Sequence, residues 1–194
     1  MNGPSFNLVV IAASAGGLEA VSAVLNCLPA SFPGAIVVVQ HLDPVHTSVM
    51  DQILGRRTAL KVSMAKQGAV LTPGGVMIAV PGRHLLVNAD ATLALTDTEQ
   101  VQFVRPSADL LFESAAAAFG ERTIAVVLTG KGGDGARGVR AIEQAGGTVI
   151  AQDEATSQSF GMPAAAIHTG HVDRILPITD IAPALIPLTR TANI

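Results

Sequence analysis

The sequence contains no tryptophan and no tyrosine, and phenylalanine, with six copies, is its only aromatic residue type. Proteins that bind single-stranded nucleic acid commonly stack the bases on aromatic side chains. The formal net charge of −3 also provides no broad attraction for phosphate backbones. We therefore expect no nucleic-acid partner, and a core of aliphatic residues favours closely packed α/β layers.

The sequence has a single cysteine, Cys27, which excludes an intramolecular disulfide. Cys27 lies within an apolar pattern of helical spacing formed by Val21, Val24, Leu25 and Leu28. The pattern predicts a buried structural thiol, because cysteines on apolar helix faces are more often packed than reactive.

Long apolar runs are also missing. No stretch approaches the roughly 20 apolar residues that a membrane-spanning helix requires. The first apolar run has no basic segment before it and ends in a Ser-Gly turn, which is not typical of a signal peptide. We expect a cytoplasmic protein with no membrane insertion.

What the chain does contain is an alternation of Val/Ile-rich runs and helix-like segments. This alternation is typical of βαβ units, in which helices cover both faces of a parallel sheet. With 49% hydrophobic residues and no linker composition, residues 1–194 are predicted to form one domain. Strands are expected near 8–13, 35–40, 60–64, 123–128 and 148–152, and helices near 17–27, 46–57, 107–119, 135–145 and 179–189.

The region between the third expected strand and Arg105 has a different character. Clusters of Pro, Gly, Asn and Asp separate short apolar runs at 76–80, 84–88 and 92–95. Such spacing predicts antiparallel hairpins. The predicted fold class is therefore α/β: a doubly wound, mostly parallel sheet in three layers, with an inserted antiparallel β-hairpin.

Three polar residues follow predicted strands at the same edge of this sheet. Ser14 comes after the first strand, His41 after the second and Asp134 after the fourth. In an open parallel sheet the carboxyl ends of the strands line one crevice, so the three side chains are expected to converge. They form a candidate Ser-His-Asp triad, with a nucleophile, a base and a group that orients the base.

The sequence around Ser14 supports this chemistry. Ala12-Ala13-Ser14-Ala15-Gly16 is a small-x-Ser-x-Gly version of the nucleophile elbow, in which small neighbours allow a sharp strand-to-helix turn. Free amides at the start of the next helix are suited to stabilising an oxyanion. Taken singly, each triad residue also has an ordinary interpretation: Ser14 and Asp134 as helix caps, and His41 as a solvated strand end.

A rival hypothesis rests on Gly130–Gly135, which fits G-x-G-x-x-G between a strand and a helix. Asp153 and Glu154 follow the next strand, where a ribose-binding carboxylate is expected in a dinucleotide site. This alternative is a noncatalytic nucleotide-binding or docking module. The segment does not fit a P-loop, because Lys131 is followed by Gly132 rather than by Ser or Thr.

The histidines do not predict a metal site. His41 with Asp43, and His168 with His171, lack the spacing and companion ligands of a recognisable zinc site. His46 lies nearer the candidate triad and is a possible substrate contact. His84 is expected to be an ordinary surface residue.

Taken in order, six landmarks of the sequence resemble the catalytic domain of the chemotaxis protein-glutamate methylesterases, the CheB family. The resemblance runs from about Val9 to about Ile178. The landmarks are Ile11-Ala12-Ala13-Ser14-Ala15-Gly16-Gly17, Gln40-His41, Arg105-Pro106-Ser107-Ala108-Asp109-Leu110-Leu111-Phe112, Leu128-Thr129-Gly130-Lys131-Gly132-Gly133-Asp134-Gly135, Ala151-Gln152-Asp153-Glu154 and Phe160-Gly161-Met162-Pro163.

The resemblance implies a serine hydrolase that removes methyl groups from methylated glutamates of chemoreceptors or similar helical proteins, and that deamidates certain receptor glutamines. No cofactor is implied, and the site is expected to be a shallow cleft. The family's nucleophile, base and orienting acid fall on Ser14, His41 and Asp134. Oxyanion or substrate contacts are expected at Ala15, Gly16, Lys131, Gly132 and Gly133, with the Lys131 amide as an oxyanion donor.

Some positions differ from the family pattern. Lys131 stands where an apolar residue is common, and Phe103 and Val104 stand where many members are more polar. Family members commonly carry an amino-terminal receiver domain that controls the esterase, whereas about seven residues precede the first strand here. The expectation is a chain without a receiver domain that is active without a switch, is regulated by a separate protein, or is one domain of a longer polypeptide.

Overall fold

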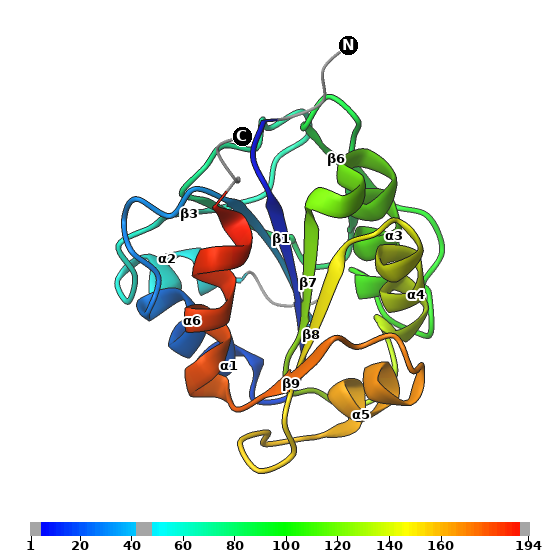
Figure 1. Ribbon diagram of the computed structural model, residues 1–194. Helices are drawn as coiled ribbons and strands as arrows, with labels where there is room; N and C mark the ends of the chain where they lie inside the picture. Colours follow the sequence, from blue (N-terminus) through cyan, green and yellow to red (C-terminus); the bar gives the residue numbers. More distant parts are fainter. Residues whose placement is uncertain (1–4, 42–47, 191–194) are drawn as a thin grey trace.

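The computed structural model describes residues 5–41 and 48–190. Seven strands form one parallel sheet in the order β3-β4-β2-β1-β7-β8-β9, and β5 and β6 form a separate antiparallel pair (Figure 1). The strands are β1 (Leu8–Ala13), β2 (Ala35–Gln40), β3 (Lys61–Met64), β4 (Gly75–Ile78), β5 (His84–Val87), β6 (Leu93–Thr96), β7 (Thr123–Val127), β8 (Thr148–Gln152) and β9 (Arg174–Leu176). The helices are α1 (Gly17–Asn26), α2 (Met50–Gly55), α3 (Ala108–Phe119), α4 (Ala136–Gln144), α5 (Gly161–His168) and α6 (Ile178–Thr189), with a short 3-10 turn, η1 (Gly120–Arg122).

The central strand β1 shows why the sheet has three layers. Every residue of β1 is buried, which explains its unbroken apolar sequence, since a parallel strand is covered on both faces. Alternate side chains enter two different cores: Leu8, Val10 and Ala12 pack with α3 and α4, and Val9, Ile11 and Ala13 pack with α1 and α6. The predicted doubly wound α/β fold is confirmed.

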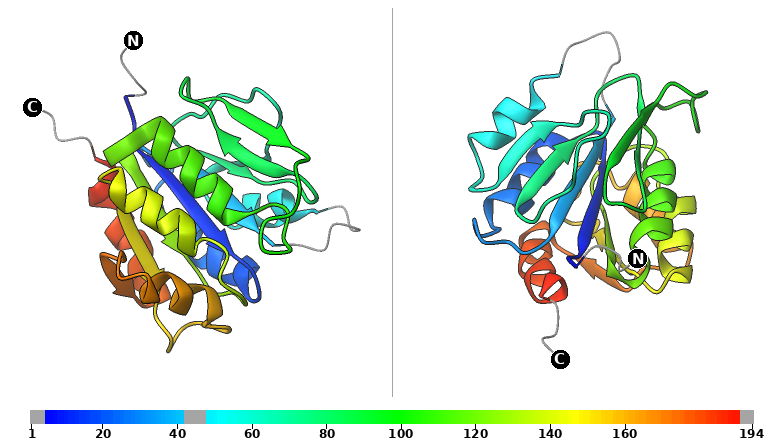
Figure 2. Two further views of the ribbon diagram at one scale, coloured as in Figure 1. Left: turned by 90° about the vertical axis from the view of Figure 1, so that its right-hand side faces the viewer. Right: turned by 90° about the horizontal axis from the view of Figure 1, so that it is seen from above.

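The region of expected hairpins was predicted correctly only in part. The runs at 84–88 and 92–95 do pair as β5 and β6, which pack beside α3 as a separate layer (Figure 2). The prediction for 76–80 is wrong: β4 lies within the main sheet and pairs in parallel with both β2 and β3. A short apolar run after a glycine turn fits both a hairpin strand and a strand of the main sheet. The burial of β4 between two other strands is what determines its role.

Two elements were not predicted, and one helix is shorter than expected. α5 and β9 follow β8, where the sequence offered only short segments, and β9 forms this edge of the sheet. α2 begins at Met50, and residues 46–47 of the expected helix lie outside the described residues. α6 accommodates Pro183 and Pro187 without interruption.

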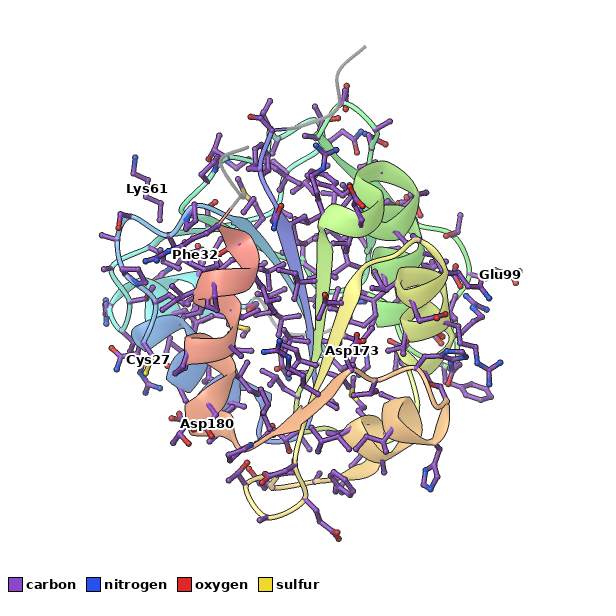
Figure 3. All side chains as sticks on the ribbon, viewed as in Figure 1. Cys27, Phe32, Lys61, Glu99, Asp173 and Asp180 are labelled. Atoms are coloured by element: carbon purple, nitrogen blue, oxygen red, sulfur yellow. The ribbon has the colours of Figure 1, made fainter. Side chains whose placement is uncertain are left out.

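Cys27 is exposed, so the prediction of a buried thiol is wrong (Figure 3). It is the C-cap residue of α1, whose buried positions include Val24 and Leu25. Two residues after Leu25 correspond to a rotation of about 200° around the helix, which turns Cys27 away from the core.

Across the described ranges, none of the helices combines the length and the apolar composition needed to cross a lipid bilayer.

Strands are added to the sheet first on one side of β1 and then on the other, and this order positions the site. From β1 the sheet is built outward on one side through β2, β4 and β3, and then on the other side through β7, β8 and β9. The turn after β1 and the loop after β7 therefore diverge at a switch point, where the crevice at the carboxyl ends of the strands is open.

Candidate active site

Ser14 is held at the switch point by backbone hydrogen bonds to both sides. Its N–H donates to the Thr129 carbonyl at 3.0 Å, and its carbonyl accepts from the Gly17 N–H at 2.8 Å. Gly16, the N-cap of α1, has φ +78°, a left-handed conformation that suits glycine and turns the chain sharply into the helix. The result is a tight strand-to-helix elbow with a partly exposed Ser14 at its corner.

His41 lies beside Ser14 at the end of the neighbouring strand. β1 and β2 are paired up to Ala13 and Gln40, and the His41 N–H extends the ladder by donating to the Ala13 carbonyl at 3.0 Å. Ser14 and His41 are the next pair in register, and neighbouring strands are about 4.8 Å apart. Among the described residues, no hydrogen bond joins the Ser14 hydroxyl to the imidazole.

His41 is paired with Asp134. The distance from His41 Nε2 to Asp134 Oδ2 is 2.8 Å, and Asp134 is only 4% exposed. The carboxylate also accepts hydrogen bonds at the first turn of α3, from Ser107 Oγ at 2.8 Å, the Ala108 N–H at 2.6 Å and the Asp109 N–H at 3.0 Å. Asp134 therefore caps α3, and not α4, which directly follows it in the chain.

These contacts determine the charge of Asp134. Burial favours the neutral carboxyl and by itself raises its pKa. The hydrogen bond from His41 and the three donors at the start of α3 favour the ionised form, and together they hold the pKa of Asp134 below its ordinary value. An ionised carboxylate only accepts hydrogen bonds, so the proton between the two side chains lies on His41 Nε2.

Asp109 makes the reciprocal contact, which the sequence analysis missed. Its buried carboxylate accepts from the Gly135 and Gly138 N–H groups, both at 2.9 Å, and so caps α4. Asp134, which lies just before α4, thus caps α3, and Asp109, in the first turn of α3, caps α4. The Ser-x-Asp spacing of residues 107–109 is typical of a helix start, but it gives no signal for this contact with a second helix.

His84 is fully buried, so the prediction of a surface residue is wrong. Its Nδ1 accepts from the Ser107 N–H at 3.1 Å, and its Nε2 lies 3.0 Å from the Glu99 carbonyl. Because Nδ1 accepts from an amide and Nε2 faces a carbonyl, the proton is on Nε2. His84 therefore fixes the backbone of Ser107, whose hydroxyl binds Asp134.

The five expected oxyanion or substrate contacts lie on two loops that meet at Ser14. A Cβ on Gly130 would lie 2.8 Å from Ser14 Cβ, so the loop after β7 passes directly over the serine. In the described part of the chain, these N–H groups donate no hydrogen bond to protein acceptors. The residues are Ala15, Gly16, Lys131, Gly132 and Gly133.

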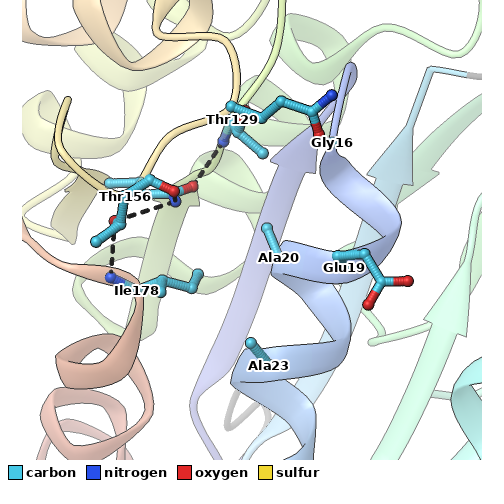
Figure 4. Close-up of a pocket in the computed structure, with 9 residues that line it drawn as sticks. Gly16, Glu19, Ala20, Ala23, Thr129, Thr156 and Ile178 are labelled. Atoms are coloured by element: carbon cyan, nitrogen blue, oxygen red, sulfur yellow. Dashed lines mark hydrogen bonds between the residues drawn. The ribbon is translucent and has the colours of Figure 1, made fainter.

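Two glutamines hold these loops in place, and neither was predicted as a site residue. Gln40 Nε2 donates to the carbonyls of Ser14, at 2.7 Å, and His41, at 3.1 Å. Gln152 Oε1 accepts from the Thr129 N–H at 2.8 Å, while its Nε2 donates to the Thr156 carbonyl (Figure 4). Both are buried polar residues at the ends of strands. In the sequence, this position alone does not distinguish a residue that supports the site from any other polar residue at a strand end.

A groove of about 210 Å³ lies next to the serine elbow, at the start of α1 (Figure 4). It is lined by Gly16, Glu19, Ala20, Ala23, Thr129, Gln152, Thr156, Gln158 and Ile178. Most of this lining is small or uncharged. Ser14 itself does not line this groove, and Glu19 is the only charged residue in the lining.

The histidines that the structure describes outside the triad show no metal site. Across residues 5–41 and 48–190, no group of three or more His, Cys, Asp or Glu side chains is placed to hold a metal ion. His171 Nδ1 lies 3.4 Å from Glu143. His46 and Asp43 lie outside the described residues.

The contacts of the Gly130–Gly135 loop do not favour nucleotide binding. A pyrophosphate binds through free N–H groups at a helix N-terminus, but the Gly135 and Gly138 N–H groups are already bound by Asp109. Asp153 Oδ1 accepts from the N–H and hydroxyl of Thr156 in its own turn. The helix start and one of the two carboxylates that the hypothesis needs, that of Asp153, are engaged within the protein.

Comparison with known proteins gives the family. The family model described as CheB methylesterase matches residues 9–185. The chain belongs to the CheB methylesterase family. A CheB methylesterase catalytic domain from Thermotoga maritima has the same fold, with a TM-score of 0.92 and 38% sequence identity over 96% of this chain and 100% of that chain.

Curated CheB relatives are longer than this chain. A protein-glutamate methylesterase/protein-glutamine glutaminase 2 of Anaeromyxobacter dehalogenans is 47% identical over 183 residues, which are 94% of this chain and 53% of that protein. The protein-glutamate methylesterase FrzG of Myxococcus xanthus is 43% identical over 182 residues, 94% of this chain and 54% of that protein. The chain spans about half the length of these relatives.

Replacing Gly130 by alanine tests how closely the two loops must approach. The new Cβ would overlap Met162 Sδ and lie 2.8 Å from Ser14 Cβ, so Ser14 or the loop must move. We expect Gly130→Ala to lower kcat/KM for an ester about 100-fold, because a shift of about 1 Å at a reacting group has that effect. Gly55→Ala is the matched control, since its nearest neighbour would be 3.9 Å away. Full activity of Gly130→Ala would show that the approach is not required.

Proposed function

We propose that this chain is a protein-glutamate methylesterase, a serine hydrolase in which Ser14 is the nucleophile, His41 the base and Asp134 the group that orients the base. The observation that carries the proposal is the 2.8 Å pair of His41 and Asp134 with Ser14 in the adjacent register position. A serine hydroxyl is weakly nucleophilic until a neighbouring base removes its proton.

The first half of the reaction forms a glutamyl-enzyme. Because Nε2 of His41 carries the proton shared with Asp134, Nδ1 is the nitrogen that accepts the Ser14 proton. Ser14 Oγ then forms a bond to the carbonyl carbon of the glutamyl methyl ester. The C–O bond to the methoxy group breaks, and His41 returns the proton to the departing methanol.

The oxyanion that develops on the ester oxygen needs N–H donors nearby. The amides of Ala15 and Gly16 on one loop and of Lys131, Gly132 and Gly133 on the other are not engaged by protein acceptors in the described part of the chain. Removal of one such donor typically costs about 100- to 1000-fold in rate. Lys131 is the donor that we assign first, as the family resemblance implies.

The second half of the reaction releases the product. Water gives a proton to His41 and attacks the acyl carbon, the bond to Ser14 Oγ breaks, and the serine recovers its proton. The product is a free glutamate. With a glutamine side chain in place of the ester, the same steps release ammonia, which is the deamidase activity in the names of several relatives.

The substrate in this proposal is a glutamate methyl ester on a chemoreceptor or a similar helical protein in the cytoplasm. A separate regulatory protein stays a prediction.

The experiment that tests the proposal is the release of methanol from a methyl-esterified chemoreceptor helix. We expect methanol in step with a mass loss of one methylene group per site in the receptor peptide. The absence of release from several methylated helical substrates would contradict the assignment. A nucleotide-binding assay with protein variants in the Gly130–Gly135 loop would then test the alternative.

A further inference from the structure

Phe103 differs from every other aromatic residue of the protein in its exposure. It is 94% exposed, whereas the other five phenylalanines are buried or half-buried. The other large apolar side chains that are exposed in the described ranges are Val49, Val70 and Ile175, at 48–59%. A single exposed apolar residue is ordinary, so the case depends on where Phe103 lies and how it is held.

Phe103 lies at the tip of a tight turn whose backbone is strained. Val101 and Val104 exchange two backbone hydrogen bonds, of 3.2 and 3.0 Å, around Gln102 and Phe103. These two central residues have φ values of +50° and +65°, a region that favours glycine and asparagine. Non-glycine residues persist there only where their surroundings hold them, and such positions cluster at functional sites.

The turn is anchored to the active site. Gln102 Nε2 donates to Asp109 Oδ2 at 2.7 Å, and Asp109 also binds Gly135 at the end of the loop after β7. Gln102 Oε1 is 3.9 Å from the position of a Cβ on Gly133. Gly133 and Gly130 are three residues apart, so their Cα atoms lie within about 11 Å, and Gly130 touches Ser14.

We infer that Phe103 is a specificity-determining contact for the protein substrate, packing on an apolar side chain that flanks the esterified glutamate. This inference rests on the proposed function. Phe103 follows Gln102, which lies next to Gly133 in the loop after β7. The Phe103 side chain itself is exposed to solvent. A protein bound at Ser14 would therefore cover it. A small ester would not reach it. Lys131 is exposed on the loop after β7 and adds a cation to the site, which suits a glutamate-rich protein surface.

The experiment compares two substrates: a methyl-esterified chemoreceptor helix and p-nitrophenyl acetate. We expect Phe103→Ala to raise KM for the receptor helix about tenfold, as loss of a buried aromatic contact predicts, with kcat changed less than twofold. For p-nitrophenyl acetate, kcat/KM should stay at the wild-type value. Val70→Ala is the control, because Val70 is also exposed but pairs with Thr92 at the start of β6. This variant should leave the kinetics with both substrates unchanged.

Phe103→Gly separates recognition from folding. Glycine relieves the positive φ at this position, so we expect a Tm at or above that of the wild type together with the same rise in KM. An unchanged KM for the receptor helix would overturn the inference while leaving the esterase proposal intact. So would an equal loss on p-nitrophenyl acetate, or dimers of the wild type that Phe103→Ala dissociates. If the wild type releases no methanol, the proposed function fails, and this inference fails with it.

Discussion

Ser14→Ala should abolish methanol release from a methyl-esterified receptor helix, with a loss of at least about 10⁴-fold in kcat. Loss of the nucleophile from a triad removes the covalent route and leaves only binding and oxyanion stabilisation. The fold should be unaffected, because the structural contacts of Ser14 are made by its backbone N–H and carbonyl. Unchanged Tm and circular dichroism would verify this.

A serine remote from the site provides the control. Ser63 lies on β3, the outermost strand of the sheet, and Ser63→Ala should retain full activity. An acylating active-site probe should add its mass to the wild type and to Ser63→Ala, but not to Ser14→Ala. Equal methanol release by the wild type and Ser14→Ala would rule out Ser14 as the nucleophile.

Asp134→Asn should lower kcat about 10⁴-fold and also destabilise the protein. The asparagine NH₂ group donates to His41 Nε2, so the imidazole proton moves to Nδ1. In that tautomer Nδ1 can no longer accept the proton of Ser14. The same NH₂ group also faces donors at the start of α3, where an unsatisfied buried group costs about 1–3 kcal/mol. We expect a loss of about 2–3 kcal/mol in the free energy of unfolding at pH 7.

The stability effect should depend on pH in a defined direction. The pKa of Asp134 is lowered in the folded protein, so the ionised carboxylate stabilises the fold at pH values above the unfolded pKa of about 3.9. This contribution is lost as the pH falls through the lower folded pKa. Urea unfolding of the wild type and Asp134→Asn should therefore differ most near neutral pH and converge in acid.

Asp90 provides a matched control for the charge change. The pKa of this carboxyl is also lowered, first by the hydrogen bond from the Thr92 hydroxyl, but Asp90 is exposed in the turn before β6. Asp90→Asn should leave kcat unchanged. If Asp134→Asn kept wild-type activity, another group would have to orient His41.

The sequence predicted the fold where each segment has only one stable role. β1 is apolar throughout and β7 is apolar after Thr123, because both faces of the sheet are covered. Their helices begin where glycines end the strands. The run at Gly75–Ile78 was misassigned because its role depends on its neighbours in the sheet. It lies between β2 and β3 and pairs in parallel with both. Local pattern carries no information about such partners.

The convergence of the three proposed triad residues followed from the sequence, whereas the residues that hold them in place did not. Ser14 and His41 stand at strand ends, Asp134 lies in the loop between β7 and α4, and the parallel sheet brings these segments together. His84 could not be assigned, because its burial results from the loop at residues 97–106 folding over β5. Asp109 and Gln152 reach across the site through contacts that no spacing rule specifies.

The position of β1 at the centre of the sheet has a consequence for protein synthesis. Ser14 and His41 leave the ribosome before Asp134, which is translated about 90 residues after His41. Until β7 inserts beside β1, the imidazole lacks its carboxylate and the serine elbow lacks the loop that passes over it. Under the proposed mechanism we therefore expect an unfinished polypeptide to be inert towards esters, and hydrolytic activity to arise only when the two halves of the sheet join.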